Sequence, residues 1–157
     1  MRKYHAAISL VLLLALAACS SSPSRTADRN GGSKDVVPYA KSLIGTPYHY
    51  GGQSPKTGFD CSGFVRYVYM KTEGIDLPRT AQDMSRVGVR IKGNQLRPGD
   101  LVFYSTQGWP YSHVGIYIGD AKFIHSPSSG KHVEIVDMSQ HYWQAHYNGA
   151  RRVTNVR

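Results

Sequence analysis

Cysteine, acidic residues and long apolar runs are all scarce in this sequence. Only two of its 157 residues are cysteine, and 19 basic residues outnumber 10 acidic ones, giving a formal net charge of +9. The main apolar run, from Ala6 to Ala18, is shorter than the roughly 20 residues that cross a bilayer as a helix. The basic residues are scattered and form no nucleic-acid-binding motif, so we expect no nucleic acid partner. An acidic polymer or an envelope surface suits this charge better.

Residues 1–18 are typical of an export signal. Arg2 and Lys3 precede the apolar run, and the Leu-Ala-Ala-Cys that ends it resembles the lipobox of bacterial lipoproteins. In that class the cysteine, here Cys19, carries a diacylglycerol and becomes the first mature residue, which anchors the protein to a membrane. The alternative is an ordinary cleaved signal with an incidental Cys19. Ser20 is similar to the sorting residue of outer-membrane lipoproteins, so we expect a lipid-anchored protein of the cell envelope, at the outer membrane and facing the periplasm.

Lipidation of Cys19 would leave Cys61 as the only thiol. A disulfide framework and a cysteine-based zinc site are then excluded, and we expect no metal and no other cofactor. Loss of residues 1–18 removes Arg2 and Lys3, which lowers the net charge to +7. A lone thiol in an exported protein is either buried and inert or reactive.

The rest of the chain divides into a tether and one domain. Residues 19–34 are rich in Ser, Gly, Asn and Arg with almost no apolar content, which predicts a flexible tether. In the domain, residues 35–157, helical patterns come first and alternating strand patterns follow. This order favours an α+β fold, with N-terminal helices packed on an antiparallel sheet. Helices are expected at 35–45, from Cys61 to a stop at Gly74, and after Thr80. Strands are expected within 95–105, 112–126 and 131–138. One helical turn and a last strand are expected near the C-terminus.

Cys61 lies at the expected start of its helix. The unpaired N–H groups there carry a partial positive charge, so we expect a lowered thiol pKa. A nucleophilic cysteine also needs a base. Alternation places His113 on one strand face with Gly115, and the hairpin signal at Gly119-Asp120 allows His125 to project from the same face. Each histidine alone is better explained as a hydrogen-bonded sheet residue, but together with the cysteine they favour catalysis.

Six sequence blocks, in this order and spacing, resemble the NlpC family of bacterial cell-wall cysteine peptidases. They are PYHYGG, GFDCSGFV, LPRTA, RPGDLVFY, SHVGIYIG and FIHS, and the match extends from about Val36 to Val153. The resemblance implies a papain-like single domain. It also implies that Cys61 is the nucleophile, that His113 is the general base and that His125 is the third residue, which orients the base.

The resemblance extends to four residues around the cysteine. Tyr48 matches a tyrosine that lines the site near the oxyanion, and Asp60 and Ser62 match residues that help to hold the peptide stem. Arg79 fits the Leu-Pro-Arg block with a less definite role. The alternative reading of Tyr48, Asp60 and Arg79 is structural: loop packing, a helix cap and a surface ion pair. The spacer between the glycine pair and Cys61 is slightly longer than in some lipoprotein members, so Tyr48 is aligned less securely than Cys61, His113 and His125.

The resemblance implies a peptidoglycan hydrolase that cuts an amide in the peptide stem, at the bond between γ-D-glutamate and the diamino acid, through a cysteine thioester. We therefore expect a monomer with peptidoglycan stem peptides as its partner. One alternative is an amidase that cuts between muramic acid and L-alanine. Another is a non-catalytic wall-binding module, although such a module has no need for Cys61, His113 and His125 together.

Overall fold

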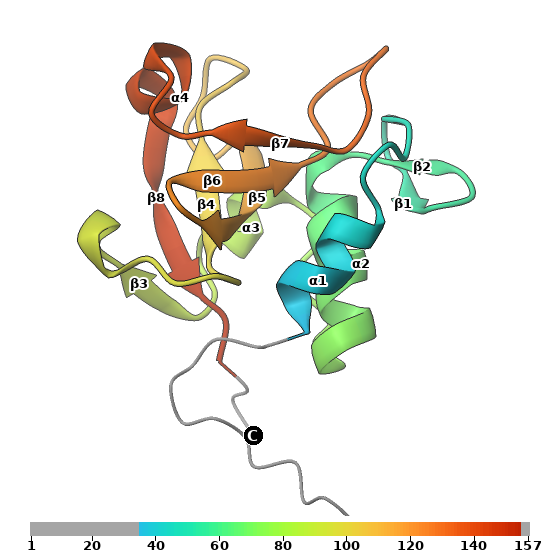
Figure 1. Ribbon diagram of the computed structural model, residues 1–157, viewed down its shortest axis with the longest axis horizontal. Coiled ribbons are helices and arrows are strands. Elements are labelled where there is room, and N and C mark those ends of the chain that lie inside the picture. Colours follow the sequence, from blue (N-terminus) through green and yellow to red (C-terminus); the bar gives the residue numbers. More distant parts are fainter. Residues whose placement is uncertain (1–34, 155–157) are drawn as a thin grey trace, which may run out of the picture.

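A computed structural model describes residues 35–154, which form a helical half and a sheet half side by side (Figure 1). Three of the four α-helices come from the first part of this range and the six-stranded sheet from the rest, so the predicted α+β fold is confirmed. The predicted signal and tether, with Cys19, lie outside the described residues, as do residues 155–157 of the predicted domain. Within residues 35–154, no helix is long and apolar enough to span a membrane.

The helical half consists of α1 (Val36–Ser42), α2 (Cys61–Glu73) and α3 (Ala81–Met84). Helix α2 begins where the sequence predicts, because Asp60 is extended and its side chain accepts a hydrogen bond from the N–H of Gly63 at 2.7 Å. It ends at Gly74, whose φ of 68° is the left-handed conformation that glycine adopts most easily. The predicted cap of α3 is also present, because the Thr80 hydroxyl accepts from the N–H of Asp83.

The segment between α1 and α2, for which the sequence pattern predicts no strand, contains a small hairpin. Its strands, β1 (Gln53–Ser54) and β2 (Gly58–Phe59), pair antiparallel. Two residues per strand leave no alternation to recognise in the sequence. The hairpin lies against the first turn of α2 and thereby places a polar loop beside Cys61.

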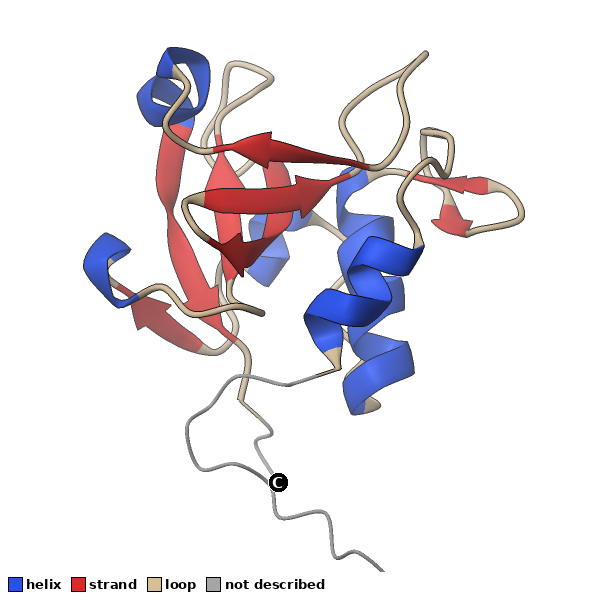
Figure 2. Ribbon diagram, in the orientation of Figure 1, coloured by secondary structure: helices blue, strands red, loops and turns tan. Residues whose placement is uncertain are grey.

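The sheet half is one six-stranded antiparallel sheet in the order β3-β8-β4-β5-β6-β7 (Figure 2). A 3₁₀ turn (Gly93–Gln95) follows β3, and helix α4 (His141–His146) directly precedes β8. The strands are β3 (Val89–Ile91), β4 (Leu101–Tyr104), β5 (His113–Gly119), β6 (Lys122–His125), β7 (Glu134–Asp137) and β8 (Tyr147–Arg152).

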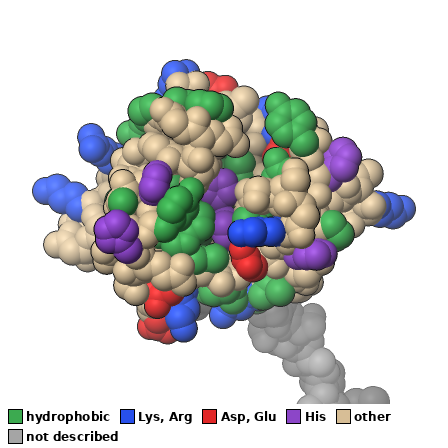
Figure 3. Space-filling view, turned by 90° about the horizontal axis from the view of Figure 1, so that it is seen from above, with side chains coloured by type: hydrophobic (Ala, Val, Ile, Leu, Met, Phe, Trp, Pro, Cys, Tyr) green, Lys and Arg blue, Asp and Glu red, His purple; other side chains and the backbone are tan. Residues whose placement is uncertain are grey.

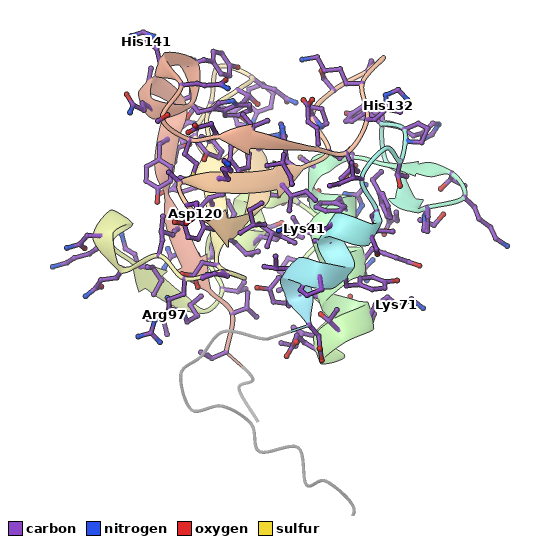
Figure 4. The ribbon with its side chains drawn as sticks, viewed as in Figure 1. Lys41, Lys71, Arg97, Asp120, His132 and His141 are labelled. Atoms are coloured by element: carbon purple, nitrogen blue, oxygen red, sulfur yellow. The ribbon has the colours of Figure 1, made fainter. Side chains whose placement is uncertain are left out.

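Strands β5 and β6 form the predicted hairpin, with its turn one residue later than predicted. Gly119 pairs with Lys122, so the two turn residues are Asp120 and Ala121, with φ of 51° and 53°. Two consecutive positive φ values match the right-handed twist of the flanking strands. Figure 4 shows Asp120 at this turn, and His113 and His125 stand at the opposite end of the hairpin.

Alternation in β5 gives the sheet two buried faces. Val114 and Ile116 pack with Phe64 and Val68 of α2 in the larger cluster. The other face is covered by a smaller cluster that includes Tyr104 and Phe123, with Trp143 of α4 packed against it. Gly115, which has no side chain, leaves room for a close neighbour. That neighbour is Phe123, whose ring carbon would lie 2.5 Å from a Cβ at position 115.

Candidate active site

Cys61 is the first residue of α2, a half-buried residue whose thiol lies against β5. The backbone N–H of Val114 on β5 lies close enough to this thiol to favour its charged form, as do the N–H groups of Ser62 and of Cys61 itself. Val114 directly follows His113. The packing of α2 on β5 therefore places the thiol beside the strand that carries the predicted base.

Burial determines the protonation state of the thiol. It raises the pKa of Cys61 to about 11, and the negative charge of Asp60 acts in the same direction. The three N–H groups lower the pKa, which is the direction expected at a helix N-terminus, but their effect is smaller. The sequence-based expectation of a lowered thiol pKa is therefore wrong for this structure: the thiol is neutral at neutral pH.

His113 and His125 contact each other directly. Their rings are buried, and Nε2 of His113 lies 2.7 Å from Nδ1 of His125. Burial lowers the pKa of His113 to about 4, and burial followed by the neighbouring His113 lowers the pKa of His125. Both imidazoles are therefore neutral at neutral pH. The prediction that the two side chains project from one face of neighbouring strands is confirmed.

Asp60, Ser62 and Arg79 form one hydrogen-bonded network beside the cysteine. Arg79 donates to both carboxylate oxygens of Asp60, at 3.1 and 2.5 Å, and to the hydroxyl of Ser62 at 2.9 Å. The carboxylate also accepts from the N–H groups of Gly51 and Gly63. Asp60 therefore caps α2 and binds Arg79 at once, which matches the structural alternative for this residue. Its predicted contact with a peptide stem, and that of Ser62, stay predictions.

Tyr48 lies close enough to Cys61, Asp60 and Arg79 for their charges to affect its pKa. Burial raises the pKa of its phenol, and charge on Cys61 and Asp60 acts in the same direction. Its backbone is fixed by a bridge to Phe59 on β2. The structure thus brings Tyr48, Asp60, Ser62 and Arg79 together around Cys61 as the sequence predicts, while Cys19 lies outside the described residues.

A hollow of about 910 Å³ adjoins the two histidines on the side where β7 and α4 pack, and its lining includes Lys131, Glu134 and Trp143. The face of the molecule in Figure 3 is hollowed in its middle, where histidine side chains are visible. Trp143 lies edge-on to His125, with ring centroids 5.2 Å apart. Sequence reasoning did not single out Trp143 or Glu134, because nothing local in the chain connects α4 or β7 with the histidines.

Within residues 35–154, no group of three or more His, Cys, Asp or Glu side chains is arranged to hold a metal ion. The polar groups at hand are a thiol, two neutral imidazoles and a tyrosine hydroxyl beside a neutralised Asp-Arg pair. A thiol with a neutral imidazole nearby can perform nucleophilic chemistry on an acyl group.

A cysteine at the start of a helix, beside a histidine on an antiparallel sheet, defines the papain-like class of folds. A family model described as "NlpC/P60 family" matches residues 45–152, and the chain belongs to that family. The predicted family and fold are thereby confirmed.

The relatives include enzymes from two bacterial species. The chain is 51% identical to the murein DD-endopeptidase MepH of Escherichia coli, over 70% of this chain and 42% of MepH. It is 43% identical to a gamma-DL-glutamyl hydrolase of Bacillus subtilis, over 77% of this chain and 29% of the hydrolase. A crystal structure of an NlpC/P60 family protein from Bacillus cereus has a TM-score of 0.71 at 38% identity and covers 77% of this chain and 40% of that one. The chain thus spans less than half the length of each of these relatives.

The two buried imidazoles make the fold sensitive to mild acid. An unfolded chain protonates His113 near pH 6.5, whereas the folded chain does so only near 4. The free energy of unfolding should therefore fall as pH drops from about 6.5 towards 4. This difference in the pKa of His113 corresponds to a loss of about 2 kcal/mol in the free energy of unfolding between roughly pH 7 and 5. Urea unfolding across this range checks the prediction.

His125 contributes to this loss in the same direction, because its pKa is lowered as well. His113→Gln should make the stability less dependent on pH. His141→Gln is the matched control, since His141 is exposed on α4 (Figure 4) and should leave the pH dependence as it is. An unchanged slope in His113→Gln would contradict the assignment of a neutral buried imidazole.

Proposed function

We propose that the chain is a peptidoglycan hydrolase, a cysteine endopeptidase that cuts an amide in the peptide stem. The single observation that carries the proposal is the placement of the Cys61 sulfur against β5 at the residue after His113, with His125 behind the base. The relatives, a murein endopeptidase and a glutamyl hydrolase, support the same substrate class.

In the proposed mechanism, the proton leaves the thiol as the sulfur attacks. Because the thiol and His113 are both neutral at rest, His113 accepts the proton during attack on the amide carbon rather than before it. Loss of the amine, protonated by His113, leaves a thioester on Cys61. Water, deprotonated by His113, then hydrolyses this thioester and restores the thiol.

Nearby donors would stabilise the oxyanion that forms during attack. The N–H groups of Cys61 and Ser62 at the start of α2 lie close to the thiol, and the Tyr48 phenol is close enough for its pKa to respond to charge on Cys61. Arg79, whose side chain is 36% exposed, is the cation placed to meet a carboxylate of the stem. We assign these supporting roles to Tyr48 and Arg79 as part of the proposal.

The first candidate bond is the one between γ-D-glutamate and the diamino acid. The similarity to the Bacillus subtilis gamma-DL-glutamyl hydrolase supports it. The second candidate is an amide between two D-configured centres, as in the peptide cross-link, which the 51% identity to MepH favours.

Digestion of purified muropeptides by the purified protein, read by mass spectrometry, tests the function and separates the bonds. A cut at γ-D-glutamate leaves a dipeptide on the sugar, whereas a cut between D-centres converts cross-linked dimers into monomers. Sugar freed of its peptide would identify the amidase alternative. Absence of any product from every muropeptide would overturn the enzyme proposal and favour a wall-binding module.

We further propose that Cys19 carries lipid and holds the enzyme at the membrane. The lipobox-like sequence supports this. Labelling cells with radioactive palmitate should mark the wild-type protein and not Cys19→Ala, which should also leave the membrane fraction. Label retained in Cys19→Ala would contradict the anchor, and Cys61→Ala is the matched control that should keep it.

A further inference from the structure

His125 has one ring nitrogen in use and one without a partner. Its side chain is 1% exposed, and Nδ1 makes the 2.7 Å contact with His113. Nε2 is buried and has no hydrogen-bond partner among residues 35–154. A buried polar atom without a partner is costly, so the group that faces it is of interest.

Glu134 is that group. In the register of β6 and β7, His125 and Glu134 are direct cross-strand partners. Oε1 of Glu134 lies 3.8 Å from Nε2 of His125, which is slightly beyond a hydrogen bond. The glutamate side chain is 48% exposed and has solvent space to rotate. A shift of about 1 Å in its carboxylate would complete a hydrogen bond.

The contact between the two histidines can be made with either ring as the donor. If His125 donates from Nδ1, the remaining proton of neutral His113 sits on its own Nδ1, which then cannot accept a proton from a thiol. If His113 donates from Nε2, its Nδ1 carries a lone pair and His125 carries its proton on Nε2. Only the second arrangement makes His113 a base, and it needs an acceptor at Nε2 of His125.

We propose that Glu134 is a positioning residue that holds His125 in the form protonated at Nε2, and thereby leaves Nδ1 of His113 free to accept the proton of the Cys61 thiol. The inference rests on the proposed function in one respect: it takes Cys61 and His113 as nucleophile and base. Glu134 touches neither the thiol nor the base, and acts through His125.

The surrounding charges agree with this role. Lys131, in the loop before β7, disfavours a positive charge on His125, and so does His113 on β5. Lys122 of β6 and Asp137 of β7 complete the charged lining of the adjoining hollow. A carboxylate at position 134 offsets Lys131. It also stabilises the positive charge that passes to the histidine pair when the thiol loses its proton.

Kinetics on the full-length protein with a muropeptide substrate give the first test. Glu134→Ala should lower kcat by about tenfold with little change in KM, because the residue orients a catalytic group without binding substrate. Glu134→Gln, which keeps an oxygen acceptor without the charge, should recover part of the loss. Asp137→Asn is the matched control, because it neutralises another carboxylate of β7. The Asp137 carboxylate accepts a hydrogen bond from the N–H of Ser139. This variant should keep kcat within about twofold of the wild type.

The tautomer of His125 gives a second test that does not depend on turnover. Long-range ¹H–¹⁵N NMR spectra should show the proton on Nε2 in the wild type and in Asp137→Asn. In Glu134→Ala a substantial fraction of the molecules should carry this proton on Nδ1 of His125 instead. The acid limb of the kcat profile should also move to lower pH in Glu134→Ala, because the charge that favours the imidazolium has been removed.

The two tests separate this inference from the proposed function. An unchanged tautomer in Glu134→Ala overturns the role of Glu134, whether or not the protein cuts muropeptides. A protein without hydrolase activity overturns the proposed function, and the spectra still decide whether Glu134 sets the tautomer. Should Glu134→Ala fold poorly in thermal unfolding, Glu134→Gln is to be compared with Asp137→Asn by the same spectra.

Discussion

Cys61→Ala is expected to reduce muropeptide hydrolysis by roughly 10⁴-fold or more, since the proposed covalent intermediate forms on the Cys61 sulfur. The fold should survive the change. The cap that starts α2 comes from Asp60 and Gly63, and the side chain of half-buried Cys61 takes no part in it. The rate of product formation by mass spectrometry and the melting temperature of the same sample check both statements.

Cys61→Ser is the informative companion. A serine hydroxyl keeps the shape of the side chain and can still accept from Val114, but it is harder to deprotonate than a thiol. A neutral imidazole should therefore fail to activate it, and Cys61→Ser should be nearly as inactive as Cys61→Ala. Turnover by Cys61→Ala within tenfold of the wild type would exclude the thioester. A melting temperature far below the wild type would show that Cys61 has a structural role instead.

The sequence predicts those parts of the site that depend on local structure. Helix α2 starts and stops where predicted, because Asp60 and Gly74 determine its ends through their own backbone and side-chain preferences. The two histidines share a face because alternation along β5 and a short turn fix their direction. Neither result needs knowledge of the rest of the chain.

The parts that the sequence misses depend on contacts between distant segments. Glu134 meets His125 only because β7 pairs with β6 in one register, and Trp143 meets it only because α4 folds over the sheet. The sequence-based expectation of a lowered pKa for Cys61 is wrong for the same reason. Two of the three N–H groups that lower it, those of Cys61 and Ser62, are local, whereas the burial that raises it comes from packing against β5.

One of the six recognised blocks, RPGDLVFY, contributes contacts that stabilise the fold rather than the site. Asp100, in the RPGD block, is 2% exposed and receives two hydrogen bonds from Arg152, in the terminal ARRV, both at 2.7 Å. The Tyr69 hydroxyl of α2 donates to the carbonyl of Gly99 in the same turn. These contacts connect α2, the turn before β4 and strand β8. A sequence block alone does not separate such a role from a catalytic one.

Gly63→Ala should destabilise the protein by roughly 3 kcal/mol or more and remove activity, although alanine normally favours a helix over glycine by about 1 kcal/mol. A Cβ at position 63 would lie 2.0 Å from the carbonyl oxygen of Gly52 and 3.0 Å from the carboxylate of Asp60. The Gly52 carbonyl is backbone and accepts from the N–H of Asp60, so neither partner can move without freeing the helix cap. Urea unfolding of both proteins gives the difference in free energy.

Gly93→Ala is the matched control for this substitution. A Cβ at position 93 meets nothing within 4 Å, and its φ lies outside the positive range, so its free energy of unfolding should stay within about 1 kcal/mol of the wild type. If Gly63→Ala is equally mild, the close approach of α2 to the Gly52 loop is not required. If it is severe, the Asp-Cys-Ser-Gly block has a physical explanation. The glycine lets the loop approach, the aspartate caps the helix and binds Arg79, and the cysteine is thereby held against β5 beside His113.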